Sequence, residues 1–388
     1  MSDADVAATG RPLRVLILNW RDPKHPQAGG AETYLFELAR RWVRLGHRVS
    51  WLTAGFPHGS ARDEIEGIEI HRVGGRATVY ALIPLYYLLR LRGGFDVIVD
   101  SENGIPFFSP LFSSIPKVCV VYHIHRRVFE ENLRWPLSRL FIWLELRLMP
   151  FLYRDSTFVT ISPTSREEME QHRISSRNIP IVYSGVDENL RPGCKSSTPT
   201  ILYLGRLKEY KRVDALVRAM PAILNDVPEA KLIVAGDGDQ RPKLERLTSE
   251  FGLGRSIEFA GFVDEGTKAR LLREAWVLAH PSSMEGWGIT VIEANACGTP
   301  AVVADSPGLR VAVVDGVSGS VVAVEAMAPE ILRVLRDAQL RERLAAGASR
   351  RAAFFSWDRA AKRMLAVIRR ELEASRINPS GRSPRSRR

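Results

Sequence analysis

Two carboxylates eight positions apart, Glu285 and Glu293, begin and end the segment EGWGITVIE. The segment follows an apolar run, so we expect the first acid in a loop and the second in the next helix. Gly286 and Gly288 free the backbone beside that helix N-terminus, where N–H groups and the helix dipole favour phosphate. Carboxylates also accept hydrogen bonds from sugar hydroxyls. The alternative is a surface acid followed by a helix salt-bridge partner.

Two cations stand at a second strand-to-helix junction. Arg206 follows the apolar run TILYLG, and Lys211 lies where the next helix is expected to begin. Arginine offers a planar fork and lysine a point charge, so the pair could hold a diphosphate. Two solvated surface cations remain the alternative.

The N-terminal half carries two further candidates. Gly29 and Gly30 separate an apolar run from a helix, a place where backbone N–H groups can approach an anion. His123 ends the run KVCVVYH and is followed by His125 and two arginines. An ordinary turn and a hydrogen-bonded structural histidine are the respective alternatives. No G-x-G-x-x-G follows a strand, so the dinucleotide-dehydrogenase signature is missing.

The elements that must position these residues alternate along the chain. Short β-branched runs are each followed by a segment of helical spacing, which indicates parallel sheets covered on both faces. We therefore predict an α/β fold of two doubly wound, Rossmann-like domains, with ligands beyond the carboxyl ends of the strands, in a cleft that the two domains face. The predicted strands are residues 14–19, 47–53, 96–101, 117–123, 157–162, 179–184, 200–205, 231–236, 257–262, 276–281 and 300–305.

Composition limits the class of protein. The chain has 388 residues, of which 45% are hydrophobic and 26% charged, values that exclude a disordered or fibrous protein and suit two domains. The longest apolar stretch, 77–89, is shorter than the ~20 residues of a transmembrane helix. Three scattered cysteines and a first segment without a secretory pattern predict a cytoplasmic protein.

The charge balance is basic, with 55 Lys and Arg against 44 Asp and Glu, a formal net charge of +11. Part of this excess lies in the last thirteen residues, RINPSGRSPRSRR, whose composition predicts a disordered tail. The remainder suits anionic partners such as nucleotides, nucleic acid or an acidic membrane face. Charge alone does not choose among them.

Taken in order, these motifs resemble the retaining glycosyltransferases of the two-Rossmann-domain GT-B fold, of the group 1 or family 4 type. The resemblance covers residues 13–374. The pieces that carry it are Gly29-Gly30, His123, Gly205-Arg206 with Lys211, the turn 235–238 and the E-x7-E element Glu285…Glu293.

The resemblance implies that the second domain binds a sugar nucleotide. Arg206 and Lys211 would hold its diphosphate, Glu293 the ribose hydroxyls and Glu285 the donor sugar. Backbone N–H groups of the adjoining loop would also contact the donor sugar. This loop consists of Gly286, Trp287, Gly288 and Ile289.

The other implied contacts complete the site. Phe262 and Val263 would contact the base, and Gly29 and Gly30 would lie by the phosphates or the acceptor. His123, with Glu285 the other implied catalytic residue, would approach the reacting centre of the donor sugar. The extra histidine and arginines after His123 depart from the family's usual pattern. No metal or other cofactor is implied.

Asp237 and Asp239 spell the D-x-D pattern with which metal-dependent transferases hold manganese. The pattern follows the run KLIVAG directly. We interpret it as a strand-to-helix turn and predict no metal site.

The segment 135–154 bears on the acceptor. Its apolar residues follow the helical period, and Arg139, Arg147 and Arg154 gather on another side with Trp135 and Trp143 nearby. This composition is typical of a helix in a membrane interface. A core helix of the first domain is the alternative.

We therefore predict an enzyme that moves a hexose from a UDP- or GDP-sugar to an acceptor hydroxyl, such as that of a lipid-linked or cell-envelope glycan, at the inner membrane face. The alternatives are a sugar-nucleotide epimerase or hydrolase of the same architecture and a non-catalytic nucleic-acid-binding protein, although no motif for reading nucleic acid is present. The expected divisions are a flexible N-terminus (1–12), an acceptor-side domain (13–186), a linker (187–199), a sugar-nucleotide domain (200–354), a crossover helix (355–374) and a basic tail (375–388).

Overall fold

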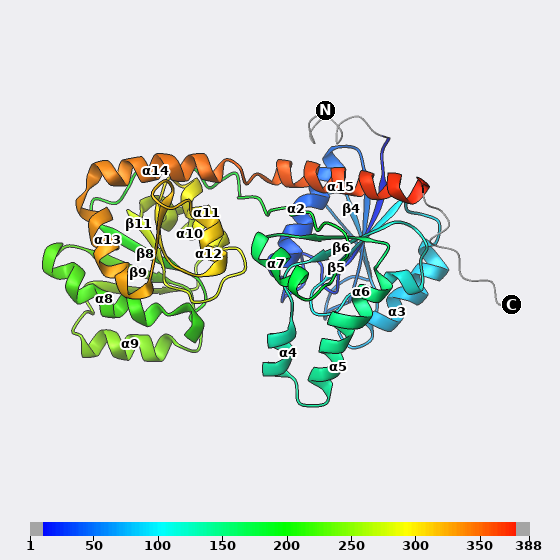
Figure 1. Ribbon diagram of the computed structural model, residues 1–388, viewed down its shortest axis with the longest axis horizontal. Helices are drawn as coiled ribbons and strands as arrows, with labels where there is room; N and C mark the ends of the chain where they lie inside the picture. Colours follow the sequence, from blue (N-terminus) through cyan, green and yellow to red (C-terminus); the bar gives the residue numbers. More distant parts are fainter. Residues whose placement is uncertain (1–10, 378–388) are drawn as a thin grey trace. The chain divides into compact units, whose positions relative to one another are not determined.

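The computed structural model describes residues 11–377, which form two units (Figure 1). The first unit combines the N-terminal half up to Ser184 with the C-terminal segment from Trp357, and the second comprises Gly185–Ser356. Both are α/β structures with parallel sheets, as the sequence predicts.

The first unit is built on a seven-stranded sheet of order β3-β4-β2-β1-β5-β6-β7. Its strands are β1 (Arg14–Leu18), β2 (Arg48–Thr53), β3 (Arg62–Ile65), β4 (Ile68–Arg72), β5 (Val97–Glu102), β6 (Lys117–Val121) and β7 (Thr157–Thr160). Its helices are α2 (Gly30–Arg44), α3 (Val79–Tyr86), α4 (Arg126–Asn132), α5 (Leu137–Trp143), α6 (Met149–Leu152), α7 (Pro163–Gln171) and α15 (Trp357–Ile377), with a 3-10 turn η2 (Ser109–Leu111) and π-helical segments η1 (Tyr87–Leu91) and η3 (Leu144–Leu148).

Alternate residues of the central strand face opposite layers of helices. Val15 and Ile17 of β1 belong to the core that α2 and α15 complete, whereas Leu16 and Leu18 pack with α3 on the other face. The sheet is therefore covered on both sides, which explains why its strands are continuous apolar runs. Among residues 11–377, the edge strand β3 is the one strand of this sheet that pairs antiparallel.

The second unit has a six-stranded parallel sheet of order β10-β9-β8-β11-β12-β13. Its strands are β8 (Thr200–Leu204), β9 (Lys231–Ala235), β10 (Ile257–Gly261), β11 (Val277–His280), β12 (Ala301–Ala304) and β13 (Gly319–Val322). Its helices are α8 (Val213–Asp226), α9 (Arg241–Glu250), α10 (Glu265–Glu274), α11 (Ile289–Ala296), α12 (Pro307–Ala312), α13 (Met327–Arg336) and α14 (Ala338–Ala352), with 3-10 turns η4 (Glu209–Lys211) and η5 (Val324–Ala326).

Three details differ from the sequence predictions. Residues 179–184 form no strand: a single bridge joins Ile181 to Thr160, and Pro180 next to it has no N–H to donate. The strands β3, β4 and β13 were not predicted because they are short and partly polar. Residues 187–199, interpreted as a linker, belong to the second unit, where the Trp276 indole donates to the carbonyl of Ser196 at 2.7 Å.

The helix α15 extends to Ile377, three residues into the segment predicted as a disordered tail. It packs with the first unit, where Met364, Leu365 and Ile368 are buried in the same core as Trp42 of α2. The rest of the predicted tail, and the predicted flexible segment up to residue 10, lie outside the described residues.

Candidate active site

In the second unit, the order of the strands predicts a ligand site at the carboxyl ends of β8 and β11. From β8 the chain adds β9 and β10 on one side, then returns to add β11, β12 and β13 on the other. In doubly wound sheets ligands bind where the direction of winding reverses. Arg206 and Lys211 follow β8, and Glu285 follows β11, so the topology brings these residues to one edge.

Lys211 and Glu285 are in direct contact there. The ammonium group of Lys211 donates to Oε1 of Glu285, and Nε2 of His280, the last residue of β11, lies 3.3 Å from the same oxygen. Arg206 is exposed, and its guanidinium donates to the Tyr210 hydroxyl at 3.3 Å. The ends of β8 and β11 thus present two cations and a carboxylate at one edge of the sheet, a set able to bind both phosphate and hydroxyl groups.

The backbone of the loop between β11 and α11 is held closely from two sides. A Cβ on Gly308 of α12 would lie 2.0 Å from the carbonyl oxygen of Glu285, so only glycine allows this approach. Gly288, with φ of 67°, takes a left-handed conformation at the N-cap of α11. Trp287, which precedes Gly288, is buried against Phe355, with ring centroids 5.1 Å apart. The loop is therefore packed firmly, while Gly286 and Ile289 remain exposed at its surface.

Glu293 lies within α11, as its helical spacing predicts, and is paired. Its Oε1 accepts from the ammonium group of Lys268 on α10 at 3.0 Å, and Lys268 also contacts Glu265 at 2.6 Å. Burial raises the pKa of Glu293 above its ordinary value, and the charge of Lys268 opposes this rise. The carboxylate thus has a partner that hydroxyl groups of a ligand would have to share or replace.

The end of β10 carries the predicted base contacts. Phe262 is 88% exposed and Val263 is half-buried, so an aromatic face is open to solvent here. The neighbouring turn at Gly236 packs tightly, because its N–H donates to the carbonyl of Gly261 at 2.7 Å.

The D-x-D pattern is a strand-to-helix turn between β9 and α9, as predicted. Asp239 pairs with Lys208 at 2.9 Å, and Asp237 accepts from the N–H of Gly238 at 2.8 Å. A Cβ on Gly238 would lie 2.3 Å from the carbonyl oxygen of Leu207, which shows how closely the turn packs on the segment after β8. Its acids are thus engaged in holding the turn.

The first unit has its own reversal of winding, between β1 and β5. Gly29 caps α2, and its N–H donates to Oε2 of Glu32 at 2.7 Å. The other oxygen of Glu32 accepts from Asn19, at the end of β1, and Asn103, just after β5, at 3.0 and 3.3 Å. A Cβ on Gly30 would meet no atom within 4 Å, so the start of α2 is open.

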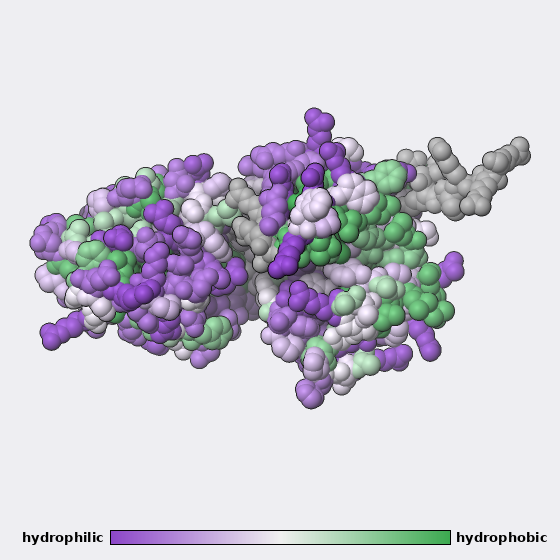
Figure 2. All heavy atoms as spheres, turned by 90° about the horizontal axis from the view of Figure 1, so that it is seen from below, coloured by the Kyte–Doolittle hydropathy of each residue, from purple (hydrophilic) through white to green (hydrophobic). Residues whose placement is uncertain are grey.

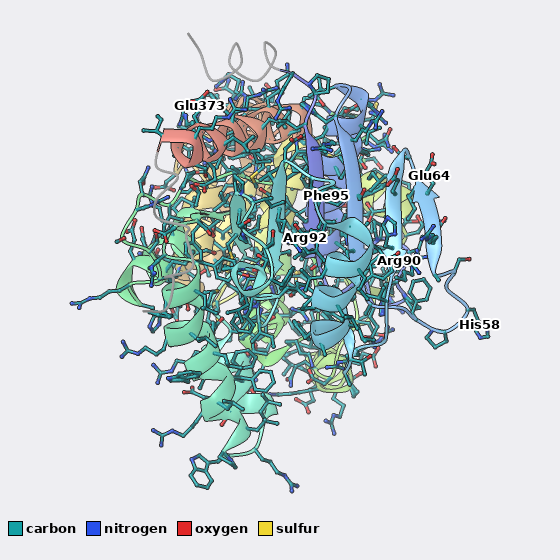
Figure 3. All side chains as sticks on the ribbon, turned by 90° about the vertical axis from the view of Figure 1, so that its right-hand side faces the viewer. His58, Glu64, Arg90, Arg92, Phe95 and Glu373 are labelled. Atoms are coloured by element: carbon teal, nitrogen blue, oxygen red, sulfur yellow. The ribbon has the colours of Figure 1, made fainter. Side chains whose placement is uncertain are left out.

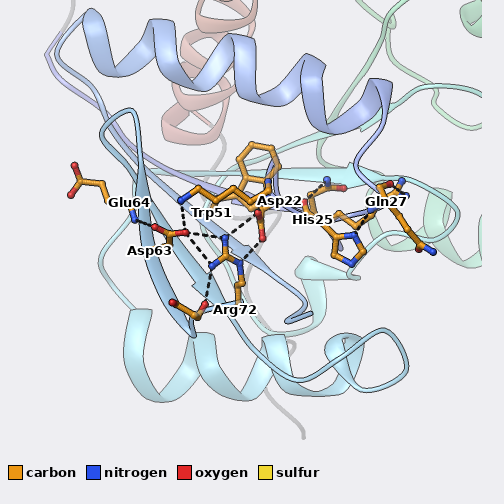
Figure 4. Close-up of polar contacts among 11 residues, drawn as sticks. Asp22, His25, Gln27, Trp51, Asp63, Glu64 and Arg72 are labelled. Carbon is orange, nitrogen blue, oxygen red and sulfur yellow. Dashed lines mark hydrogen bonds and ion pairs between the residues drawn. The ribbon is translucent and has the colours of Figure 1, made fainter. Parts of the chain in front are cut away.

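The loop that leads from β1 to Gly29 is anchored by a buried ion pair (Figure 4). The guanidinium of Arg72, from β4, donates to both carboxylate oxygens of Asp22, at 2.7 and 3.1 Å, and to Asp63 at 3.3 Å. Asp22 is completely buried, and the Arg72 side chain is 2% exposed. A bidentate pair of this kind fixes the loop geometrically as well as energetically.

His123 lies two residues beyond the end of β6 and is exposed, beside a buried group of charges. Its ring lies 4.1 Å, centroid to centroid, from that of His125. Nδ1 of His125 lies 3.3 Å from Oε1 of Glu102 and 3.2 Å from Oε1 of Glu145. Ligand atoms of these three residues lie within 4.8 Å of one another, a spacing that a divalent cation could also bridge.

The pKa values of the two histidines move in opposite directions. Burial alone would lower the pKa of His125, but the adjacent carboxylates of Glu102 and Glu145 outweigh it and raise the pKa to about 10. The side chain of His123 reaches solvent, but protein atoms around the ring partly desolvate it, and this desolvation, followed by repulsion from His125, lowers the pKa of His123. Desolvation raises the pKa of Glu145 to about 7.

The structure thus groups the predicted residues by unit. Arg206, Lys211 and Glu285 lie together in the second unit, and Gly29 and Gly30 start α2 in the first. Several neighbouring polar residues escaped the sequence reasoning, namely Glu32, Glu102, Asn103, Glu145, Tyr210 and His280. Their place at strand ends could have revealed Glu102, Asn103 and His280, whereas no sequence signal marks Glu145 within an amphipathic segment.

Comparison with known proteins gives a consistent result for both halves of the chain. The family model for glycosyl transferases group 1 matches residues 189–351, and that for glycosyltransferase family 4 matches residues 28–190. A relative from Methanocaldococcus jannaschii, described as an uncharacterized glycosyltransferase, is 27% identical and spans 93% of this chain and 99% of its own. A phosphatidyl-myo-inositol mannosyltransferase of Mycolicibacterium smegmatis is 28% identical, over 85% of this chain and 87% of its own.

A solved structure shares the fold. The sucrose-phosphate synthase of Thermosynechococcus elongatus superimposes with a TM-score of 0.73 at 20% identity, over 94% of this chain and all of its own.

Proposed function

Because the chain belongs to the group 1 glycosyltransferases of the GT-B fold and is an enzyme that transfers sugar, we propose that its donor is a UDP- or GDP-hexose. The hexose passes to an acceptor hydroxyl with retention of its anomeric configuration and without a metal ion. No nucleic acid takes part.

The observation that carries this proposal is the contact between Lys211 and Glu285 at the edge where β8 and β11 meet, beside exposed Arg206. A departing nucleoside diphosphate gains negative charge, which two cations and the N-terminus of α11 can stabilise. When the diphosphate binds Lys211, Glu285 becomes free to accept a hydrogen bond from a donor-sugar hydroxyl. Glu293 holds the ribose hydroxyls in the same way, in competition with Lys268.

Retention follows from same-face attack. The acceptor hydroxyl passes its proton to an oxygen of the leaving phosphate as its own oxygen bonds to the anomeric carbon, so no protein carboxylate serves as the base. His123 in the first unit lies near the donor sugar during this step. Gly29 and Gly30, with open space beside Gly30, leave room for the phosphates or the acceptor.

The first test is donor binding without added metal. Thermal shifts with UDP, GDP, ADP and their sugar conjugates should single out one base, because a ligand at a hundred times its Kd adds about 2.7 kcal/mol of stability. Lys211→Ala should abolish the shift, since the diphosphate loses its buried charge partner. Lys208→Ala, whose ammonium group pairs with Asp239 in the same segment, is the matched control and should bind as the wild type does. Equal donor affinity in Lys211→Ala and wild type would refute the site.

The second test is the reaction itself, followed by NMR of the anomeric proton. Transfer with the donor's configuration is the expected result. Free sugar or an epimer, released at catalytic rates from donor alone, would instead establish a hydrolase or epimerase.

We further propose that the acceptor is a lipid-linked glycan or a lipid and that the enzyme works in the cytoplasm, at the inner face of the membrane. The supporting observation is that only one side of the segment 135–154 packs in the core, where Met149 and Tyr153 are buried and Leu146 and Leu152 pack against them. Its buried positions include Glu145 and Met149, whereas the large apolar side chains on its other side are exposed. Those exposed side chains are Trp135, Leu137, Leu140, Trp143 and Phe151.

A second apolar segment strengthens this proposal. Leu82, Leu85, Leu88 and Leu89 of α3 and η1 are exposed, and Arg90 and Arg92 follow at the end of the helix (Figure 3). Figure 2 shows hydrophobic side chains gathered in patches, with hydrophilic ones at their borders, on the right-hand unit. Exposed leucine and tryptophan beside arginine is the composition of a membrane-interface surface. A relative named for phosphatidyl-myo-inositol also supports a lipid acceptor.

The α4–α5 pair projects from the sheet of its own unit in both Figure 1 and Figure 3. A groove of about 800 Å³ on it is lined by Leu140, Trp143 and Leu146 together with Arg139 and Arg147. Within the described residues no helix is both long and apolar enough to cross a bilayer. Contact with a membrane would therefore be made through these surfaces.

Cosedimentation with lipid vesicles tests the proposed membrane contact. The protein should bind vesicles that contain anionic lipid and bind neutral ones less, since the arginines add an electrostatic attraction to apolar insertion. Trp143→Ser with Leu140→Ser should weaken binding severalfold. Leu45→Ser, an equally exposed leucine elsewhere in the unit, is the control. Unchanged binding in the double variant would refute the surface.

A further inference from the structure

Glu102, His125 and Glu145 form a buried group, which we name the acid–histidine cluster, that has no assigned part in sugar transfer. The three residues come from different elements, the end of β5, the N-cap of α4 and the segment η3. The side chains of both acids are completely buried, and that of His125 is 7% exposed. One ligand atom from each residue lies within 4.8 Å of the other two. Imidazole nitrogen and carboxylate oxygen are atoms with which proteins bind divalent metal ions.

The charges of the cluster do not balance within the protein. Two carboxylates face one imidazole, so even a protonated His125 leaves an excess negative charge. Among the side chains that the structure describes, no lysine or arginine forms an ion pair with either acid. A buried charge without compensation is costly. A divalent cation bound to the two carboxylates and a neutral imidazole would bring the net charge of the cluster to zero.

Each acid also keeps one oxygen atom without a hydrogen-bond partner. Oε1 of Glu102 accepts from the N–H of Gly104 at 3.0 Å, and Oε1 of Glu145 accepts from the N–H of His125 at 2.6 Å. Oε2 of both acids is buried and accepts no hydrogen bond from the described part of the chain. Buried carboxylate oxygens are normally satisfied, and a bound ion is one way of satisfying them. The unpaired oxygens therefore indicate a ligand of the cluster besides the protein's own groups.

The distances within the cluster are those expected of ligands around one ion. Nδ1 of His125 lies 3.3 Å from Oε1 of Glu102 and 3.2 Å from Oε1 of Glu145. Ligand atoms about 2.1 Å from a metal ion are about 3.0 Å apart at right angles and about 3.4 Å apart at tetrahedral angles. A single N–H on Nδ1, by contrast, can point well at only one of the two oxygens. One ion can therefore contact all three atoms with little movement of the side chains.

We propose that the acid–histidine cluster binds one divalent transition-metal ion of the zinc class. An imidazole nitrogen favours zinc and its neighbours over Mg²⁺ and Ca²⁺, which prefer sites made of oxygen atoms. The ion takes the place of the proton on Nδ1 of His125, so binding releases that proton to solvent. Three protein ligands leave a fourth position for a water molecule. The proposed transfer of sugar needs no such ion, so we assign the ion a structural role.

The ligands lie where an ion would fasten the α4–α5 pair to the sheet. His125 precedes α4 and Glu145 follows α5, so these residues stand at the two ends of the pair, whereas Glu102 ends a strand of the sheet. One ion bound to all three residues would hold both ends of the pair at the end of β5. The ring of His123 lies 4.1 Å, centroid to centroid, from that of His125, so the ion would also fix the segment that carries the predicted catalytic histidine.

The test is a zinc titration of the full-length protein, stripped of metal with a chelator and followed by calorimetry. We expect one Zn²⁺ per chain, bound much more tightly than Mg²⁺. In Glu145→Gln and in Glu102→Gln the affinity for Zn²⁺ should fall by more than about a hundredfold, because loss even of a group that only hydrogen-bonds to a metal ligand costs about 10- to 100-fold. Glu130→Gln, which changes an exposed acid paired with Arg126 of α4, should leave zinc binding as in the wild type.

Thermal unfolding gives a second readout, which an ordinary hydrogen-bonded cluster would not show. Zinc at a hundred times its Kd should raise the unfolding midpoint of the first unit by about 5 to 10 °C in the wild type and in Glu130→Gln. The same zinc concentration should leave the midpoints of Glu145→Gln and Glu102→Gln unchanged. Where one acid variant does not fold, the other replaces it, and zinc titration of the wild type needs neither.

Four results would overturn the inference. One is a folded wild-type protein that does not bind zinc at one ion per chain, and another is unchanged zinc affinity in the acid variants. The third is Mg²⁺ bound as tightly as Zn²⁺. The fourth is loss of zinc binding in Asp239→Asn, which would place the ion at the D-x-D turn. These measurements need neither donor nor acceptor, so absence of transfer with every donor would refute the proposed function and leave the metal site standing.

Discussion

At the scale of the residue, the candidate site is held by pairs of opposite charges. Lys211 is paired with Glu285, and Lys268 with Glu293. Neither carboxylate is left without a cation, and neither lysine is free in solvent, with side-chain exposures of 11% and 17%. In the proposed function a diphosphate would take Lys211 from Glu285, whereas the neutral hydroxyls of a ribose would share Glu293 with Lys268, whose charge they do not replace.

The buried imidazole of His280 predicts that the second unit loses stability at acidic pH. Burial lowers its pKa to about 4, although Glu285 beside it acts in the opposite direction. The unfolded chain takes up a proton as the pH falls through about 6.5, while the folded protein does so only near 4. Unfolding is therefore favoured progressively between these values, and the stability lost through this group should approach about 3 kcal/mol at the acidic end.

Urea unfolding of the second unit between pH 7 and pH 4 measures this loss. His280→Gln, which cannot take up a proton, should show a smaller loss over the same range. Parallel pH dependence in wild type and variant would show that His280 is not held neutral.

At the scale of the element, one loop depends on a strand far from it in sequence. The loop from β1 to α2 carries Asp22, and β4 carries Arg72, whose bidentate contact holds the loop in place. The start of α2 is thus placed by a pair of residues fifty positions apart rather than by the loop's own sequence.

The Arg72–Asp22 ion pair predicts that removal of Arg72 destabilises the first unit far more than removal of the nearby Lys24. Arg72→Ala leaves the carboxylate of Asp22 buried without its partner, so we expect a loss of about 3–5 kcal/mol in the free energy of unfolding of the first unit. Lys24→Ala removes only a half-exposed ammonium group that pairs with Asp63 at 2.8 Å, and should change stability little. Chemical denaturation of the three proteins measures the difference, and similar stability in both variants would contradict the prediction.

At the scale of the whole molecule, the second unit is inserted into the first along the chain. The helix α15 follows the second unit in sequence but completes the core of the first, where the Trp42 indole donates to the carbonyl of Ala361 at 3.1 Å. The second unit, by contrast, is a continuous segment with its own sheet and core.

This arrangement predicts which fragments fold. Residues 185–356 alone should unfold cooperatively and should bind the sugar nucleotide. Residues 1–184 alone should not fold, because burial of Met364, Leu365 and Ile368 is lost, and core side chains of this size each contribute about 2–5 kcal/mol. A peptide of residues 357–377 added in trans should restore its structure by circular dichroism. Cooperative unfolding of 1–184 without the peptide would refute the dependence.

The sequence by itself determined the alternation of strands and helices and the residues that follow most strands, because both depend on local patterns. Continuous apolar runs indicated parallel sheets, and two glycines beside Glu285 marked a loop that leads into a helix. Short polar strands such as β3 escaped, since pairing at a sheet edge is decided by the neighbouring strand and not by the strand's own residues. The helical period of residues 135–154 was correct, but period alone does not say which face a helix buries.

Only the tertiary structure decided which charges meet. Glu145 reaches His125 across twenty residues, Lys268 reaches Glu293 across twenty-five, and Arg72 reaches Asp22 across fifty. Such pairs form because different elements end at the same edge of a sheet or pack on the same loop. Local spacing in the sequence does not predict these contacts. The sequence therefore identifies the residue types available for chemistry. The fold determines which residues are their partners, and these partners determine their charge states.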